Sequence, residues 1–215
     1  MNILIPARGG SKRIPNKNII EVAGKPLICY SIEQALRITP NVYVSTDCDK
    51  IGEVARSAGA HIISRPSRYA TDSSDVRDTI RHFLEAVETD IFVLMQPTSP
   101  LLTEKYIKEG LQKIENSDSV ISVCEVREFF WGADRRPLNY ELGKKPRTQD
   151  MAPYYKENGA FYITRAQAFQ NTHDLTNGKV DFVIMPEDES VDIDTYFDLK
   201  YCKLLLQWRE ENDEI

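Results

Sequence analysis

Basic residues cluster just after the first apolar segment of the chain. The string from Ile5 to Asn18 reads IPARGGSKRIPNKN, and four of its residues carry positive charge: Arg8, Lys12, Arg13 and Lys17. The whole chain of 215 residues has 27 Lys and Arg against 33 Asp and Glu, a formal net charge of −6, so this cluster reverses the overall sign locally. The neighbouring Gly9-Gly10 allows backbone N–H groups to approach phosphate oxygens closely. The combination predicts a loop that binds an anion.

The two glycines do not belong to either of the common phosphate-binding motifs. A Walker A loop requires GxxxxGK followed by Ser or Thr, and a dinucleotide site requires GxGxxG, but neither string occurs here. The basic side chains must therefore supply most of the charge neutralisation. A surface turn with solvated cations is the alternative. The loop follows a predicted strand, and its place at the carboxyl end of that strand favours ligand binding.

Two carboxylates near the C-terminus, Asp192 and Asp194, are separated by one residue. In an extended segment both project to the same side and could share a hard cation such as Mg²⁺. An Asp-x-Asp just before a helix could instead cap that helix, and Asp194-Thr195 followed by Asp198 suits this role. The residues alone leave both interpretations open. Asp47 raises the same choice after an earlier strand, and there we favour capping of the next helix.

The elements that position these residues alternate between short apolar runs and amphipathic helical patterns. This alternation predicts an α/β fold, with a Rossmann-like, mostly parallel sheet and helices on both faces. Predicted strands, rich in Ile or Val, cover residues 2–5, 42–46, 61–64, 91–96, 119–125, 160–164 and 180–185. Predicted helices begin after Pro26 and further cover residues 49–58, 75–87, 104–115 and about 196–209. Gly59 suits a left-handed helix end.

An irregular segment from about 126 to 158 interrupts what we otherwise expect to be a single domain of residues 1–215. It is rich in Arg, Lys, Pro and aromatic residues, among them Phe129, Phe130, Trp131, Tyr154 and Tyr155. A structureless loop of this length is uncommon inside a compact domain. We therefore expect a lid, a substrate pocket or an oligomer contact.

Composition argues against several other classes of protein. The net negative charge disfavours a broad nucleic-acid footprint. The four cysteines form no CxxC pair and have no histidine at metal-ligand spacing, which argues against a zinc site and predicts reduced thiols. The N-terminus shows no signal-peptide core, and no apolar stretch approaches the roughly 20 residues that span a bilayer. We expect the protein in the cytoplasm, with neither a nucleic acid nor a membrane as partner.

Six strings along the chain together resemble the acylneuraminate cytidylyltransferases, also called CMP-sialic acid synthetases, including those for legionaminic and pseudaminic acid. They are IPARGGSKRIPNKN (5–18), VSTD (44–47), RPSRYATD (65–72), QPTSPL (96–101), RTQDMAPYYKENGAFYI (147–163) and DIDTYFD (192–198). Each string is short, but their order and approximate spacing agree with the family nearly from end to end. The resemblance implies the fold of nucleotide-diphospho-sugar transferases, with the irregular segment serving dimerisation and sugar binding.

The resemblance also implies roles for the residues that match the family's motifs. The implied CTP site comprises Arg8, Gly9, Ser11, Lys12, Lys17, Asn18, Arg65 and Ser73, with Arg65 against the cytosine. The implied sugar site comprises Gln96, Arg147, Gln149, Asn158 and Tyr162. Asp192 and Asp194 would hold Mg²⁺, and with Arg8 and Lys17 they would form the catalytic set.

Chemistry by itself leaves alternatives for several of these residues. Arg65 can donate to O2 and N3 of cytosine, or it can be a turn residue before a proline. The prolines after Gln96 have a sufficient structural reason in a turn that leads to a helix N-cap at Thr103, although this does not explain Gln96. Asn158-Gly159 could bind a sugar or form a tight turn that enters a strand.

The implied reaction transfers CMP from CTP to the anomeric hydroxyl of a nonulosonic acid and releases pyrophosphate, with Mg²⁺ as cofactor and a homodimer as the assembly. Aromatic residues at 129–131 replace histidines and a lysine of some members, and Tyr69 and Thr148 replace a common Leu and Arg. Sialic, legionaminic and pseudaminic acid therefore all remain candidate substrates. A KDO cytidylyltransferase and a catalytically silent nucleotide-binding module on the same fold are the competing interpretations.

Overall fold

Seven strands form one sheet in the computed structural model, which describes residues 1–212. In spatial order they are β5 (His61–Ser64), β4 (Val42–Thr46), β1 (Asn2–Pro6), β6 (Ile91–Met95), β8 (Tyr154–Arg165), β7 (Ser119–Val126) and β9 (Val180–Met185). Neighbouring strands are parallel except where β8 pairs with β6 and β7. The predicted mostly parallel α/β sheet is therefore confirmed.

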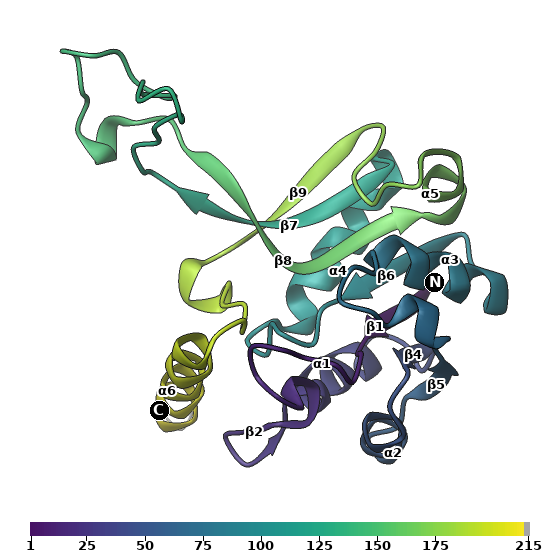
Figure 1. Ribbon diagram of the computed structural model, residues 1–215. Coiled ribbons are helices and arrows are strands. Elements are labelled where there is room, and N and C mark those ends of the chain that lie inside the picture. The colour runs from purple at the N-terminus through teal and green to yellow at the C-terminus, as the bar shows by residue number, and fades with distance from the viewer. Residues whose placement is uncertain (213–215) are drawn as a thin grey trace.

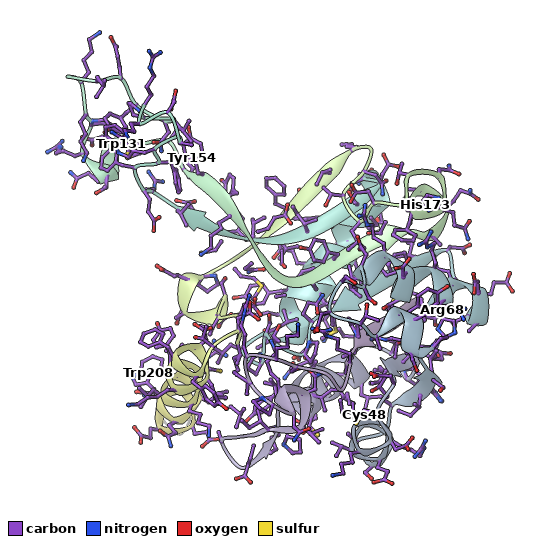
Figure 2. All side chains as sticks on the ribbon, in the orientation of Figure 1. Cys48, Arg68, Trp131, Tyr154, His173 and Trp208 are labelled. Carbon is purple, nitrogen blue, oxygen red and sulfur yellow. The ribbon has the colours of Figure 1, made fainter. Side chains whose placement is uncertain are left out.

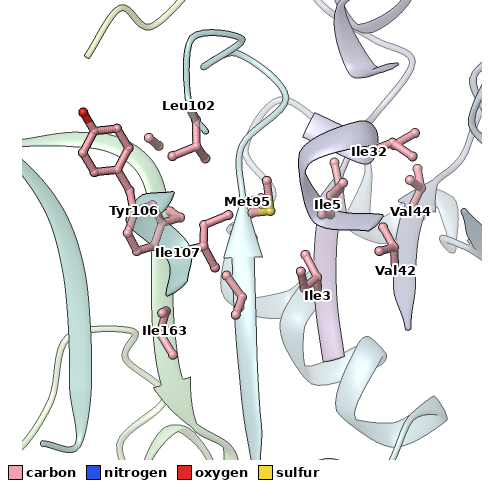
Figure 3. Close-up of a cluster of buried hydrophobic side chains, with 14 of the residues drawn as sticks. Ile3, Ile5, Ile32, Val42, Val44, Met95, Leu102, Tyr106, Ile107 and Ile163 are labelled. Carbon is pink, nitrogen blue, oxygen red and sulfur yellow. The ribbon is translucent and has the colours of Figure 1, made fainter. Parts of the chain in front are cut away.

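Helices pack on both faces of the sheet (Figure 1). α1 (Leu27–Leu36), α2 (Asp49–Ser57) and α4 (Glu104–Lys113) share one buried cluster with the strands, and α3 (Val76–Ala86) and α5 (Ala166–Thr172) share another. Alternate residues of β1 supply the two clusters: Ile3 and Ile5 pack with Ile32 of α1 (Figure 3), whereas Leu4 packs with Phe83 of α3. This alternation explains why the strands read as continuous apolar runs.

The C-terminal helix α6 (Tyr196–Asn212) packs away from the sheet, in a third buried cluster. Its Leu199 and Cys202 belong to this cluster. So do Ile14, from the loop of residues 7–18 that carries the four cations and is called the basic loop below, and Val191, from the segment before the helix. The helix runs beyond the predicted end near Arg209. This small core holds the N-terminal loop beside the C-terminal segment 186–195. A short hairpin of β2 (Glu21–Val22) and β3 (Lys25–Pro26) lies next to it.

The irregular segment forms the end of an arm that β7 and β8 carry away from the rest of the molecule (Figure 1). Residues 127–153 contain one isolated bridge, between Trp131 and Pro137, and a short 3-10 helix, η4 (Thr148–Asp150). The segment is shorter than predicted, because β8 begins at Tyr154 rather than at Ala160. Pairing with β7 along the arm extends the strand beyond its apolar part.

The tight-turn interpretation of Asn158-Gly159 is wrong. Both residues lie inside β8, where the pairing with β7 shifts register between Ile121 and Val123. Gly159 has φ +70, a conformation that glycine adopts without strain. The Asn158-Gly159 pair therefore marks a β-bulge, at which the strand turns from the sheet into the arm.

Smaller elements complete the chain. They are the 3-10 helices η1 (Lys17–Ile19), η2 (Ser67–Tyr69), η3 (Ile114–Asn116) and η5 (Glu187–Glu189). Gly59 has φ +97 after α2, which confirms the predicted left-handed helix end. All four cysteines are unpaired. No helix within residues 1–212 is long and apolar enough to cross a membrane.

Close packing of α4 on the sheet generates a testable difference between two helical glycines. A Cβ atom at Gly110 would lie 2.7 Å from Ile163 Cδ1 and 3.2 Å from Phe161 Cε2, whereas one at Gly52 of α2 would have no atom nearer than 3.8 Å. Gly110→Ala should lower the free energy of unfolding by about 1–3 kcal/mol through overpacking. Gly52→Ala should raise it by up to about 1 kcal/mol, because alanine favours helix. Urea denaturation measures both, and stabilisation by Gly110→Ala would contradict the packing described.

Candidate active site

The carboxyl ends of the central parallel strands open onto a cleft of about 580 Å³. We call it the larger cleft, because a smaller one of about 310 Å³ adjoins it. Its wall includes Pro6 at the end of β1, Arg65 after β5 and Gln96 after β6. Ligands of open parallel sheets bind at this edge, where the loops that follow the strands converge. The basic loop lies in this wall, as expected from its place after the first strand.

The basic loop is fixed by contacts with the segment that follows β4. The Gly9 N–H donates to Asp47 Oδ1 at 2.9 Å, and a Cβ atom at Gly9 would lie 2.9 Å from Cys48 Cβ. Glycine is therefore required at this close approach. Asn18, which is buried, donates from Nδ2 to the Arg8 carbonyl at 2.9 Å and ties the two ends of the loop together.

The expected capping role of Asp47 is wrong. Cys48 occupies the N-cap position of α2, and its side chain makes no capping hydrogen bond. The Asp47 carboxylate instead turns toward Gly9, whose N–H needs an acceptor in a loop without regular structure. Asp47 therefore supports the basic loop.

Asp194 connects the basic loop to the C-terminal segment. Its Oδ1 lies 3.0 Å from Lys17 Nζ and its Oδ2 lies 2.7 Å from Arg13 Nη1. Lys17 also donates to the Ile193 carbonyl at 2.9 Å, and its side chain is only 16% exposed. These contacts bring together residues that are 177 and 181 positions apart.

A second aspartate pairs with the other two cations of the loop. Asp72, which lies between η2 and α3, places Oδ1 3.0 Å from Arg8 Nη1 and Oδ2 2.6 Å from Lys12 Nζ. Arg8 also donates to the Thr71 carbonyl at 2.8 Å. All four cations of the basic loop are therefore paired with carboxylates from distant parts of the chain.

Asp192 and Asp194 occupy the same wall but titrate differently. Restricted hydration raises the pKa of Asp192, and the negative charge of Asp194 adds to this effect. Restricted hydration acts in the same direction on Asp194, but hydrogen bonds and charge from Lys17 and Arg13 outweigh it and hold the pKa of Asp194 below its ordinary value. Opposite shifts in adjacent carboxyl groups are frequent at functional sites.

The predicted cap at the start of α6 is formed by Thr195 and Asp198, without the carboxylates of Asp192 and Asp194. Asp198 Oδ2 accepts from the N–H groups of Asp194 at 3.0 Å and Thr195 at 2.7 Å, and the Thr195 hydroxyl accepts from the Asp198 N–H at 3.3 Å. This reciprocal arrangement is a capping box. Since it satisfies the start of α6, neither the Asp192 nor the Asp194 carboxylate is needed as a cap. Both residues line the smaller cleft, where the Asp194 carboxylate pairs with Lys17 and Arg13.

Arg65 forms part of the floor of the larger cleft and is 7% exposed. Its Nε donates to Ser45 Oγ at 3.1 Å and its Nη2 to the Ser45 carbonyl at 2.6 Å. Burial lowers the pKa of Arg65 to about 10, so the guanidinium stays charged near neutral pH. The side chain is anchored to β4 rather than to its own turn, which leaves part of the guanidinium for a ligand.

A smaller cleft of about 310 Å³ adjoins the larger one. Lys17, Gln96, Thr98 and Asp194 line both clefts, and Asp192, Gly159 and Tyr162 complete the smaller one. Tyr162 donates to Glu157 Oε2 at 3.1 Å, and burial raises the pKa of Tyr162 to about 12, so its hydroxyl keeps its proton. Two ligand groups that meet between the clefts would therefore contact the shared side chains.

Not every residue singled out in the sequence reaches these walls. Arg147 and Gln149 lie on the arm, and Arg147 pairs with Asp150 at 2.8 Å with its side chain 75% exposed. Asn158 is buried and donates to Ser190 Oγ at 3.0 Å, so it fastens the β-bulge to the segment after β9. Ser73 is not part of either cleft wall, although its neighbours Asp72 and Ser74 are.

Two residues of the site were missed from the sequence. Thr98 lines both clefts, and its carbonyl accepts from the Ile193 N–H at 2.9 Å. Asp72 meets two cations of the basic loop. Both residues stand inside the strings QPTSPL and RPSRYATD, but nothing in their spacing indicated contacts with the N-terminal loop or the C-terminal segment.

The carboxylates that line the smaller cleft fit one kind of Mg²⁺ site. Within residues 1–212 there is no group of three or more His, Cys, Asp or Glu side chains that could hold a metal ion unaided. Mg²⁺ is commonly held by one or two carboxylates together with water and substrate phosphates. Asp192 and Asp194, which both line the smaller cleft beside the basic loop, fit this second kind of site.

Comparison with known proteins identifies relatives over nearly the whole chain. A family profile described as Cytidylyltransferase matches residues 2–209. The chain is 39% identical to N-acylneuraminate cytidylyltransferase B of Danio rerio, over 91% of this chain and 48% of that protein. It is 31% identical to a pseudaminic acid cytidylyltransferase of Campylobacter jejuni, over 97% of both chains. The chain thus spans about half the length of the first relative and nearly all of the second.

A solved structure described as CMP:2-keto-3-deoxy-manno-octonic acid synthetase complexed with CTP shares the fold. The TM-score is 0.74 with 21% sequence identity, over 97% of this chain and 98% of the other. A likeness at this level of identity establishes the architecture alone.

Proposed function

Because the chain belongs to the cytidylyltransferase family, we propose that it transfers CMP from CTP to the anomeric hydroxyl of a nonulosonic acid and releases pyrophosphate. The observation that carries this proposal is the pair of adjoining clefts with Lys17, Gln96, Thr98 and Asp194 in common. Transfer of a nucleotidyl group requires two substrates to meet at one phosphorus atom. Two clefts that share a wall provide such a meeting point.

The larger cleft suits CTP in volume and in charge. Its 580 Å³ lies within the range of small-molecule sites, and the cations of the basic loop line one side. Arg65, anchored on Ser45, supplies donors for the O2 and N3 acceptors of a cytosine base. The triphosphate would then extend from the region of Arg65 toward Lys17 and Asp194.

The proposed mechanism is an in-line displacement at the α-phosphate, with charge stabilisation as the main contribution of the protein. Arg8, Lys12 and Lys17 would offset negative charge on the transferring and leaving phosphates. Lys17 is the best placed of the three, because Ile193 and Asp194 already hold its ammonium between the two clefts. No covalent intermediate on the enzyme is required.

We propose Mg²⁺ as the cofactor, with Asp192 and Asp194 as its protein ligands. A bound divalent ion would neutralise phosphate charge and lower the pKa of a coordinated hydroxyl. The chain's own contribution is a pair of neighbouring carboxylates: restricted hydration raises the pKa of Asp192, and the negative charge of Asp194 adds to this effect. Such a pair favours a cation between or beside its members.

The smaller cleft is the proposed site of the acidic sugar, with Gln96 and Tyr162 as polar contacts. Glu157 Oε2 accepts a hydrogen bond from the Tyr162 hydroxyl, which fixes the orientation of the ring. The exact sugar is open among the sialic, legionaminic and pseudaminic acids. The two relatives differ in this respect, since one is named for an acylneuraminate and the other for pseudaminic acid.

A homodimer is the proposed assembly, with the arm reaching toward the neighbouring active site. The arm exposes large apolar side chains, including Trp131 at 52% (Figure 2) and Leu138 at 68%. Exposed apolar groups of this size are typical of contacts with another protein. Arg147 and Gln149, which lie on the arm away from the clefts of their own chain, could serve the sugar site of the partner.

Light scattering tests the assembly. We expect a mass near twice the 24.6 kDa of one chain, and Leu138→Asp should shift the mass toward the monomer because it places a charge in an apolar contact. Leu138 is exposed within the single chain, so the variant should fold. A monomeric mass that does not depend on protein concentration would refute the homodimer.

Pyrophosphate release from CTP, measured against a panel of nine-carbon and eight-carbon sugar acids, tests the proposed function. We expect release with at least one nine-carbon acid, none with KDO, and loss of release when divalent ions are chelated. Preference for KDO would support the competing synthetase. Silence across the panel with intact CTP binding would favour a nucleotide-binding module, and turnover that survives chelation would contradict the proposed metal.

A further inference from the structure

The basic loop has its charges neutralised from two sides. Asp194 pairs with Arg13 and Lys17, and Asp72 pairs with Arg8 and Lys12. Asp194 has a second proposed task as a metal ligand. Asp72 has no task in the proposed reaction, although it lines the larger cleft and contacts two cations assigned to the triphosphate.

The geometry of Asp72 is that of a bridging anion. Its two oxygens contact different cations: Oδ1 lies 3.0 Å from Arg8 Nη1, and Oδ2 lies 2.6 Å from Lys12 Nζ. Two oxygens of one phosphate group could make the same pair of contacts. Hydrogen bonds from Lys12 and Arg8 hold the pKa of Asp72 below its ordinary value, so the carboxylate is ionised at neutral pH.

These contacts are exposed enough to exchange. The side chains of Asp72 and Lys12 are 46% and 75% exposed, and ion pairs at such positions contribute little to stability. A triphosphate carries more charge than one carboxylate and has more acceptor oxygens. It should therefore displace Asp72 from the cations at a modest free-energy cost.

The turn that carries Asp72 is organised without help from its carboxylate. The Thr71 N–H donates to Ser74 Oγ at 2.9 Å, and the Ser74 N–H donates to the Thr71 carbonyl at 3.2 Å. η2 precedes the turn, and the capping residue Asp75 of α3 follows it. Among residues 1–212 the Asp72 carboxylate bonds to Arg8 and Lys12 alone, so it can leave them while the turn persists.

We propose that Asp72 competes with the triphosphate for Arg8 and Lys12, because its carboxylate makes the two contacts that a phosphate group would make. This inference rests on the proposed use of CTP and adds to it a residue that sets nucleotide affinity. The charge of Asp72 also relieves repulsion among cations that stand within ten positions of one another. Its cost is weaker binding of every polyphosphate, the leaving pyrophosphate included, which favours product release.

Calorimetric titration with inorganic tripolyphosphate, with divalent ions chelated, tests the competition. Asp72→Asn keeps the shape of the side chain and removes its charge, so the dissociation constant should fall about threefold or more, because two partly exposed ion pairs no longer have to be broken. Asp72→Glu keeps the charge and should stay within about twofold of the unmodified protein. Unchanged or weaker binding by Asp72→Asn would overturn the proposal.

A matched control separates direct competition from a general change of charge. Asp75 also lines the larger cleft, but it pairs with Arg77 outside the basic loop. Asn is a good N-cap, so Asp75→Asn should fold and raise the charge of the cleft equally. Equal tightening by Asp75→Asn and Asp72→Asn would overturn the competition by showing a long-range effect.

The kinetic readout distinguishes this inference from the proposed function itself. Asp72→Asn should lower the KM for CTP without raising kcat, because tighter ground-state binding does not accelerate the chemical step. A protein that binds tripolyphosphate as predicted but releases no pyrophosphate from CTP would refute the proposed function and leave the role of Asp72 intact. If the protein turns over CTP but Asp72→Asn has the same KM for CTP as the unmodified protein, the role of Asp72 is refuted and the proposed function stands.

Discussion

The ion pair between Lys17 and Asp194 is the interaction on which the site depends. It joins the loop after the first strand to a segment 177 positions later, and both clefts take part of their walls from these two residues. A lysine that is only 16% exposed needs a compensating charge, and Asp194 supplies it. The contact therefore couples the closing of the chain to the construction of the site, since neither cleft is complete before the C-terminal segment has packed.

The remainder of the fold serves to hold these two segments together. The small core of Ile14, Val191 and Leu199 fixes the approach of the two segments, while the capping box of Thr195 and Asp198 fixes the start of the last helix. The parallel sheet contributes the edge at which Arg65 and Gln96 emerge. The β-bulge at Gly159 turns β8 from the sheet into the arm and at the same time lines the smaller cleft. One backbone irregularity thus connects the proposed sugar pocket to the proposed dimer contact.

Local patterns were sufficient for most of the architecture and for part of the site. The apolar runs and amphipathic periods predicted the strands of the sheet and most helices, because β1, β4, β5 and β6 pack by regular alternation against α1 to α4. The turn predicted at Asn158 and the cap predicted for Asp47 were wrong because the partners of these residues, Ser190 and Gly9, are 32 and 38 positions away and no local spacing encodes such pairs. The contacts of Thr98 and Asp72 could not be predicted for the same reason, since their partners are also distant in the sequence. Arg147 and Gln149 lie on the arm. The direction of the arm depends on the β-bulge at Asn158-Gly159, which the sequence pattern had suggested could be a tight turn.

The central claim is that Asp194 serves chemistry between the two clefts and is more than a partner for Lys17. The most direct measurement is kcat for pyrophosphate release by Asp194→Asn at saturating CTP and sugar acid, together with its thermal midpoint. We expect kcat to fall at least about a hundredfold, the scale of losing one preorganised charge contact in a transition state. The thermal midpoint should fall as well, because the largely buried Lys17 loses its compensating charge, but the asparagine oxygen can still accept hydrogen bonds from Lys17 and Arg13, so the variant should fold. A turnover rate close to that of the unmodified protein, with the fold intact, would contradict the account.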